Sequence, residues 1–208
     1  TQLEEILRIF DAQKKNAQNV KNTTVADRLK KIKKLRQVVY DNREKIQKAL
    51  WADFHKPATQ VDLTEIVPII SEAKNFEANL YDWAADKEVD TPLPLFGTSA
   101  KIVLEPKGNA LFLTPWNYPF QLLFTPLVGA IAAGNCCVLK ASEFAPATAA
   151  VMKELIDTTF DKTYILFTEG DGATVIPEMM NAFSFDHVFY TGSTAVGKII
   201  YKMAAERL

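Results

Sequence analysis

The stretch Thr114-Pro115-Trp116-Asn117-Tyr118-Pro119 separates two apolar runs and decides how the rest of the chain is interpreted. The run before it, residues 109–113, is predicted to be a buried strand. The run after it, residues 120–133, is predicted to be a buried helix. Ligands bind at the carboxyl ends of strands in open α/β sheets. We therefore expect Asn117 to be buried there and to use its amide, either in a local turn or as a hydrogen-bond donor to developing negative charge.

Short apolar runs and helical stretches alternate on the carboxyl side of residue 100. The predicted strands are 101–105, 110–113, 136–139, 164–167 and 187–190, and the predicted helices are 120–133, 147–160, 173–180 and Thr194 to the end of the chain. Strands joined by helical crossovers of this length form parallel βαβ units. The predicted fold class is therefore α/β with a parallel sheet.

The amino-terminal part has a different composition. All 8 glycines lie at or beyond Gly97, and no Gly or Pro occurs before Pro57. This pattern predicts helices over residues 2–17, 24–56 and 62–83, with Thr24 as a helix cap and Pro68 starting or kinking the third. We place a helical region at 1–86, a connector with one strand at 87–105, and an α/β region at 106–208. Glu65 and Glu72 are assigned to the helix surface, away from the sheet edge.

Composition limits the functional classes. The chain has 24 Lys and Arg against 25 Asp and Glu, a net charge of −1, so a nucleic-acid partner is not expected. The adjacent Cys136 and Cys137 form no disulfide framework and are predicted to be buried fillers, which favours a reducing, cytoplasmic setting. His55 and His187 lack neighbouring ligands at metal spacing, and no metal site is expected. No apolar run reaches the length of a membrane-spanning helix.

Two further motifs follow predicted strands. In Lys140-Ala141-Ser142-Glu143, a donor and an acceptor flank one pocket and could bind ribose hydroxyls; a surface ion pair or a helix cap by Ser142 is the alternative. In the stretch from Tyr190 to Gly197, Gly192 and Ser193 begin a helix whose amides could face a pyrophosphate. Both the Walker motif and the G-x-G-x-x-G fingerprint are absent there.

Together these residues resemble the aldehyde dehydrogenase superfamily, most strongly its class 3 branch for fatty or aromatic aldehydes. The likeness covers nearly the whole chain and keeps the family's motif order and spacing. It is carried by Asp53–Lys56, Trp83–Asp86, Leu104–Gly108, Thr114–Pro119, Pro126–Asn135, Val138–Glu143 and Phe185–Ser193. One departure is Ala141, where the family usually has Pro.

The resemblance implies a Rossmann-like sheet that binds NAD, with NADP as the alternative. Asn117 matches the amide of the oxyanion hole, and the cofactor-binding matches are Thr114, Pro115, Trp116, Lys140, Ser142, Glu143, Gly192 and Ser193. It also implies a homodimer, in part through the strand of the 87–105 segment, and an aldehyde oxidised through a covalent thioester. Some relatives carry a carboxyl-terminal membrane anchor.

The family's general-base Glu and nucleophilic Cys follow later than residue 208. The last helix shows no stop signal before Leu208, so we expect a truncated amino-terminal portion that does not turn over by itself. Two rival hypotheses are a non-catalytic protein that uses the cofactor fold for binding or assembly, and a reductase of acyl-CoA or acyl phosphate from the same superfamily.

Overall fold

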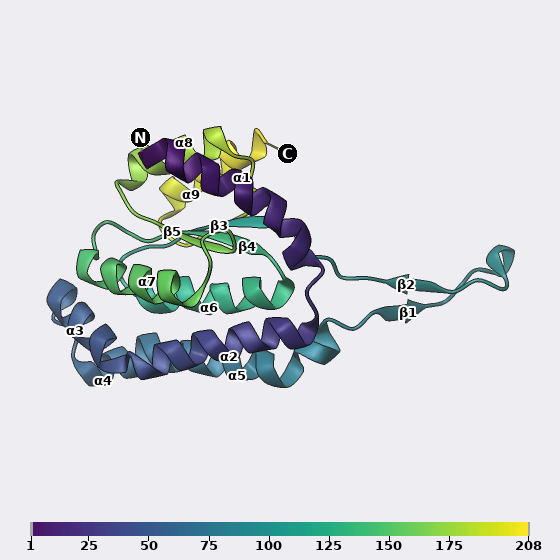
Figure 1. Ribbon diagram of the computed structural model, residues 1–208, viewed down its shortest axis with the longest axis horizontal. Helices are drawn as coiled ribbons and strands as arrows, with labels where there is room; N and C mark the ends of the chain where they lie inside the picture. The colour runs from purple at the N-terminus through teal and green to yellow at the C-terminus, as the bar shows by residue number, and fades with distance from the viewer. Residues whose placement is uncertain (1, 208) are drawn as a thin grey trace.

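A parallel sheet lies between two groups of helices in the computed structural model, which describes residues 2–207 (Figure 1). Its strands are β3 (Asn109–Leu113), β4 (Cys136–Lys140), β5 (Ile165–Thr168) and β6 (His187–Tyr190), in the order β5-β4-β3-β6. Every pairing within it is parallel. The strands predicted at 110–113, 136–139, 164–167 and 187–190 are confirmed to within one residue, and so is the α/β class.

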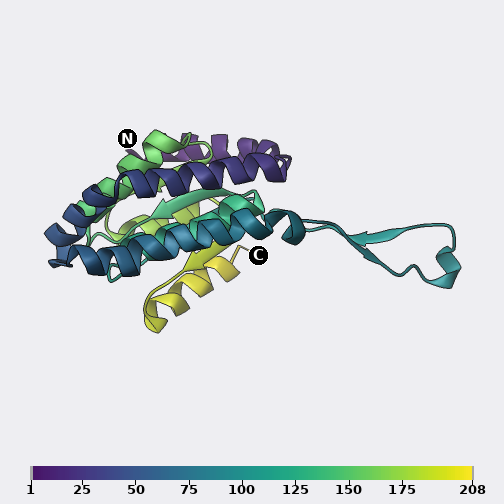
Figure 2. The same ribbon diagram turned by 90° about the horizontal axis from the view of Figure 1, so that it is seen from below.

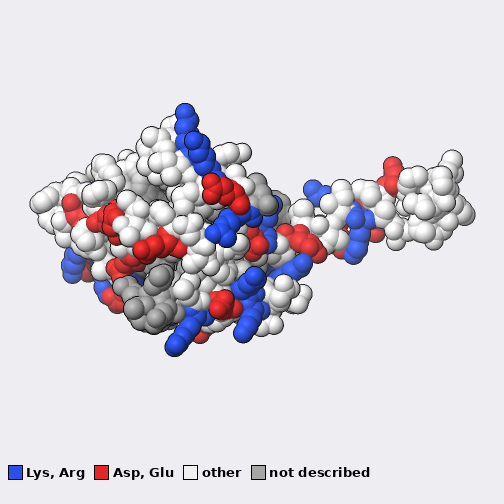
Figure 3. All heavy atoms as spheres, turned by 90° about the horizontal axis from the view of Figure 1, so that it is seen from above, with Lys and Arg blue, Asp and Glu red and all other residues white. Residues whose placement is uncertain are grey.

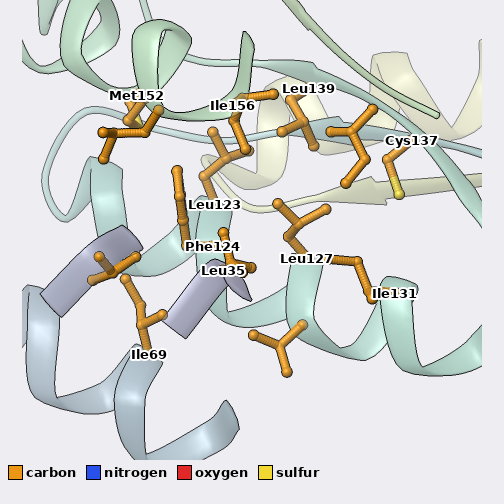
Figure 4. Packing of buried hydrophobic residues seen from close by; sticks show 14 of the residues in the cluster. Leu35, Ile69, Leu123, Phe124, Leu127, Ile131, Cys137, Leu139, Met152 and Ile156 are labelled. Atoms are coloured by element: carbon orange, nitrogen blue, oxygen red, sulfur yellow. The ribbon is translucent and has the colours of Figure 1, made fainter. Parts of the chain in front are cut away.

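Both faces of the central strands are buried. In β3, Ala110 and Phe112 join one apolar cluster, while Leu111 and Leu113 join the cluster on the opposite face. Such two-sided burial is typical of parallel sheets covered by helices on both sides. Figure 4 shows part of the larger cluster, in which residues of the helices lie across from Cys137 and Leu139 of the sheet.

The helices form layers on the two faces of the sheet. On one face lie α6 (Pro119–Ala133) and α7 (Pro146–Thr159), and the amino-terminal helices α2 (Val25–Asp41), α3 (Arg43–Phe54) and α5 (Val67–Trp83) pack outside them. The other face carries α1 (Gln2–Lys21), α8 (Gly172–Ala182) and α9 (Thr194–Ala205), as Figure 1 shows. The helical region is therefore part of the body that covers the sheet.

The predicted single helix over 24–56 is interrupted at Asn42. Thr24 caps α2 as expected, since its side chain accepts a hydrogen bond from the Asp27 amide at 3.1 Å. Asn42 then leaves helical geometry, with φ −102° and ψ 16°, and its side-chain amide donates to the Val38 carbonyl at 2.9 Å. An Asn side chain that competes for backbone groups disfavours a continuous helix.

The third predicted helix contains an irregular start. A short helix α4 (Ala58–Val61) leads into a π-helical turn, η1 (Asp62–Ile66), in which the Val67 amide bonds the Asp62 carbonyl. The α-helix α5 follows, with Pro68 in its first turn. The predicted starting role of Pro68 is confirmed, and the π-turn was not predicted because no sequence pattern specifies it.

An arm projects from the body in both views (Figures 1 and 2). It contains the antiparallel strands β1 (Lys87–Val89) and β2 (Ala100–Ile102) and a 3₁₀ turn, η2 (Leu93–Leu95). The strand predicted at 101–105 is therefore shorter and begins one residue earlier. Leu93 and Phe96 near the tip are 87% and 92% exposed.

Acidic and basic side chains are interspersed on the face shown in Figure 3, in keeping with the small net charge. Within residues 2–207, no helix has the length and apolar character needed to cross a membrane. The last helix ends at Ala205. The sequence analysis predicted it to continue to Leu208, which lies outside the described residues.

The start of α7 depends on a carboxylate from the helical region. Its cap residue, Ala145, offers no side-chain bond, and Asp53 of α3 accepts instead from the amides of Ala147 at 3.0 Å and Thr148 at 2.7 Å. We expect Asp53→Ala to lower the free energy of unfolding by about 1–2 kcal/mol, because two helix-start amides lose their acceptor. Urea unfolding of the purified protein measures this. The matched control is Asp41→Ala at the exposed end of α2, and an equal loss there would contradict the capping role.

Candidate functional site

The register of the sheet brings all three predicted motifs to one edge. Leu113 at the end of β3 is paired with Lys140 of β4 on one side and with Tyr190 of β6 on the other. The segments that begin at Thr114, Ala141 and Thr191 therefore leave the sheet side by side. This carboxyl edge is where open α/β sheets bind ligands.

In the first segment, which begins at Thr114, the side chain of Asn117 is exposed to solvent. Thr114 is 9% exposed and its amide donates to the Lys140 carbonyl at 3.3 Å, but the chain then leaves the sheet. Asn117 is exposed, so the expectation that its side chain is buried is wrong. Trp116 is 51% exposed and its ring lies 6.0 Å from that of Phe54. The Asn117 side chain is therefore accessible to solvent at the carboxyl edge of the sheet.

The second segment contains a real ion pair. Lys140 Nζ lies 2.8 Å from Glu143 Oε2, with the two side chains 3% and 33% exposed. Burial alone would raise the pKa of Glu143, but the hydrogen bonds from Lys140 and from the Gly172 amide outweigh it, and the pKa of Glu143 lies below its usual value. The pair is thus more buried than a surface ion pair, and Glu143 stays charged at neutral pH.

Ser142 is used in a local turn. Its hydroxyl oxygen accepts from the Phe144 amide at 3.3 Å, while α7 begins at Pro146 and takes its carboxylate cap from Asp53. The suggested role of Ser142 as a helix cap is therefore wrong. Its hydroxyl instead closes the turn that follows β4.

The third segment is organised by Tyr190. Its hydroxyl donates to the Ser193 carbonyl at 3.1 Å, and a Cβ added to Gly192 would lie 2.2 Å from that hydroxyl. A Cβ on Gly197 would lie 3.1 Å from the same ring. Ser193 caps α9, since its side chain accepts from the Val196 amide at 3.3 Å. Both glycines therefore make room for the Tyr190 ring at the start of the helix.

Two charged residues of the helical region, Lys56 and Glu65, reach this edge, and the sequence analysis assigned neither of them to the site. Glu65 is fully buried, so its assignment to the surface is wrong. Its Oε1 lies 2.5 Å from Lys56 Nζ, and its Oε2 accepts from the Phe120 amide at 3.1 Å and the Gln121 amide at 2.9 Å. A signal was present, because Glu65 lies four residues from both Val61 and Ile69, which are buried.

Opposing effects set the ionisation of Glu65. Burial disfavours the charged form of Glu65 and raises its pKa. The Lys56 ammonium and the two helix-start amides lower the pKa, but by less, so that it lies above its usual value. A carboxylate with a cation on one oxygen and two backbone donors on the other is the arrangement that makes a buried charge tolerable.

The remaining candidates lie outside the site chemistry. Cys136 and Cys137 are buried, and burial raises the pKa of Cys136 to about 11 and that of Cys137 well above its usual value. Neither is a thiolate at neutral pH, which confirms their prediction as fillers. His55 and His187 are exposed, and the part of the chain that the structure describes contains no group of three or more metal-ligating side chains.

The parallel sheet, covered by helices on both faces, defines the class of the protein as a Rossmann-like α/β protein. Solved structures agree. AldH of Staphylococcus aureus in its substrate-bound state matches 97% of this chain and 44% of its own, at 41% identity and a TM-score of 0.89. Betaine aldehyde dehydrogenase of the same organism, in complex with NAD⁺, matches at 27% identity, with a TM-score of 0.85 and 97% and 41% coverage.

The chain belongs to the aldehyde dehydrogenase family, because the model of the "Aldehyde dehydrogenase family" matches residues 1–208. It is 42% identical over 193 residues to 4,4'-diaponeurosporen-aldehyde dehydrogenase of Staphylococcus aureus, covering 93% of this chain and 41% of that protein. It is 37% identical to aldehyde dehydrogenase family 3 member B1 of Rattus norvegicus, covering 94% and 42%. The chain thus spans about two fifths of the length of these curated relatives.

The Lys140–Glu143 pair makes a pH-dependent contribution to stability. A lowered folded-state pKa means that the stabilisation is present above the usual value of 4.5 and is lost as the pH falls through the lowered pKa. We expect Glu143→Gln to reduce the melting temperature at neutral pH and the difference from the unchanged protein to shrink below pH 4.5. Thermal unfolding over a pH series measures this. Glu178→Gln, exposed on α8, is the control, and a difference that does not depend on pH would contradict the assignment.

Proposed function

We propose that this chain is the amino-terminal, cofactor-binding part of an NAD(P)-dependent aldehyde dehydrogenase that oxidises aldehydes to carboxylic acids. The observation that carries the proposal is the sheet register, which places the exposed Asn117 loop beside the Lys140–Glu143 pair and the start of α9. The family membership and the relatives named as aldehyde dehydrogenases support it.

The edge residues fit a dinucleotide. The Thr114 hydroxyl is buried and has no hydrogen-bond partner within residues 2–207, so it can accept or donate to a bound ligand. We assign the nicotinamide side of the cofactor to Thr114, Pro115 and Trp116. The ribose hydroxyls are assigned to the Lys140-Ser142-Glu143 segment, and the pyrophosphate to Gly192 and Ser193 at the start of α9. NAD⁺ bound to the betaine aldehyde dehydrogenase relative supports a nicotinamide cofactor.

In this proposal Asn117 supplies one donor of the oxyanion hole. When the aldehyde carbon is attacked, its oxygen gains negative charge, and a side-chain N–H aimed at that oxygen stabilises the charge. A nicotinamide cofactor held by Thr114, Pro115 and Trp116 would supply the acceptor for the hydride of the substrate carbon. The attacking thiolate and the base that activates water come from sequence beyond residue 208 of the longer enzyme. The buried Cys136 and Cys137 do not replace them, so we expect residues 1–208 alone to form no NADH.

Assembly and location extend the proposal. The exposed apolar side chains of the arm, among them Leu93 and Phe96, support a homodimer in which the arm meets a second copy. The two buried free cysteines support a reducing, cytoplasmic setting. The proposed substrate is an aldehyde. The length of aldehyde that the enzyme accepts depends on residues outside residues 1–208.

The oxyanion role predicts a loss of turnover. In the full-length protein, Asn117→Asp keeps the shape of the side chain but replaces the N–H donor by an acceptor, and we expect kcat to fall about 10²- to 10³-fold. Aldehyde-dependent NADH formation measures this, and NAD binding serves as a check on the fold of the site. Asn75→Ala, exposed on α5, is the control. The role is refuted if Asn117→Asp turns over at the unchanged rate, and a full-length protein that oxidises no aldehyde refutes the proposed function itself.

The charge of Glu143 predicts a preference for NAD. A carboxylate beside the ribose repels the 2′-phosphate of NADP, so the full-length protein should bind NAD with the lower dissociation constant. Glu143→Gln should reduce this preference by improving NADP binding. Calorimetric titration with both cofactors tests it. Tighter binding of NADP by the unchanged protein would show that Glu143 does not face the ribose.

A further inference from the structure

We propose that Lys56 and Glu65 are positioning residues for Asn117: their buried ion pair holds the backbone from Asn117 to Gln121 and thereby sets the direction of the Asn117 side-chain amide. This inference rests on the proposed function for its effect on turnover. Its structural part, that the ion pair holds the loop, stands independently of that function.

The hydrogen bonds of the ion pair all converge on the same segment. Lys56 and Glu65 are 8% and 0% exposed, and such a pair is favourable only when its remaining donors and acceptors find partners. Glu65 finds them at the amides of Phe120 and Gln121. Lys56 finds one at the carbonyl of Asn117, at 3.1 Å. The pair therefore ties the end of α3 and the π-turn to the loop that carries Asn117.

The start of α6 has no cap of its own. Tyr118 at the cap position makes no side-chain bond, and Pro119 has no N–H, so the first available donors are those of Phe120 and Gln121. A carboxylate at a helix start also complements the helix dipole. Glu65 thus serves as the cap of α6 from a distant part of the sequence.

The position of the Asn117 side chain depends on its backbone. The side chain is exposed and makes no hydrogen bond with the residues that the structure describes. The backbone carbonyl of Asn117, in contrast, accepts a hydrogen bond from Lys56. The Lys56 ammonium also lies 4.4 Å from the centre of the Tyr118 ring. On the other side Trp116 packs against Phe54. Residues 116–118 are therefore all held by the segment Phe54–Lys56, and loss of this contact would let the amide point in several directions.

The chain itself directs Lys56 to this place. His55 ends α3 in the left-handed region, with φ 52°, which turns the chain so that Lys56 is buried while His55 is exposed. In η1, Asp62 faces Arg43 at 2.5 Å near the surface, while Glu65 faces inward. Two ion pairs thus join α3 to the π-turn, and only the buried one contacts the Asn117 loop.

The experiment compares the two ion pairs in the full-length protein. Lys56→Met or Glu65→Gln alone leaves one buried charge unpaired and can prevent folding. The double variant Lys56→Met/Glu65→Gln removes both charges, and the amide oxygen of the introduced glutamine remains an acceptor for the α6 amides. The matched control, Arg43→Met/Asp62→Asn, removes the outer pair between the same two elements. Lys56→Arg, which keeps the charge and the donors, tests for rescue.

Amide hydrogen exchange and turnover are measured for each variant. In the buried-pair double variant we expect the amides of residues 116–118, 120 and 121 to exchange faster, because the neutral amide oxygen of the glutamine is a weaker acceptor than the carboxylate, and we expect kcat to fall about 10- to 100-fold. Lys56→Arg should restore most of the activity, and the outer-pair control should change neither readout. In an Asn117→Ala background, the double variant should cause little further loss, because both changes act through one amide.

Each contrary result has a distinct meaning. Unchanged exchange in residues 116–121 overturns the structural part of the inference. The positioning role is overturned if exchange is faster but the double variant lowers kcat as much in the Asn117→Ala background as in the unchanged protein. The effect would then not pass through Asn117. If the unchanged full-length protein oxidises no aldehyde, the proposed function fails, and the exchange comparison still decides whether the ion pair holds the loop.

Discussion

Burial of both faces of the central strands is the constraint on which the other elements depend. Each strand presents alternate residues to two separate apolar clusters, so helices must cover the sheet on both sides. Parallel pairing then requires crossovers, and those crossovers begin at one edge and end at the other. All three site segments leave at the same edge for this reason. Apolar packing therefore brings these segments to one edge of the sheet before any polar residue acts there.

The sequence pattern was sufficient to predict the sheet, but it did not predict the contacts between segments that are distant in sequence. Apolar runs and crossover spacing located the strands because their burial is a local pattern. Asn42 and the π-turn were missed because each depends on a single local hydrogen bond, from the Asn42 side chain to the Val38 carbonyl and from the Val67 amide to the Asp62 carbonyl. Motif likeness located Lys140 and Glu143 at the edge, and the structure joins them. Glu65 was misassigned because a charged residue on a helix is usually solvated, and because the two backbone amides that bond it are 55 and 56 residues away.

Carboxylates from elsewhere in the chain cap the helices around the site. Glu65 serves α6, Asp53 serves α7, and Glu143 accepts from Gly172 at the start of α8. The helices α6 and α7 each begin with a proline and have no side-chain cap from their own cap residue. Positive helix starts would otherwise gather at this edge without compensation. The helical region thus supplies carboxylates to the starts of α6 and α7, whereas α9 is capped by its own Ser193.

The π-turn at Asp62–Ile66 makes the site sensitive to chain length as well as to residue type. Each residue of a regular helix advances the direction of its side chain by about 100°. The loss of one residue from this turn would change no other side chain. It would, however, rotate the residues before the turn relative to those after it about the helix axis. Asp62 and Glu65 could then no longer face the surface and the interior at once. Among relatives, a gap of one position here would therefore matter more than many substitutions nearby.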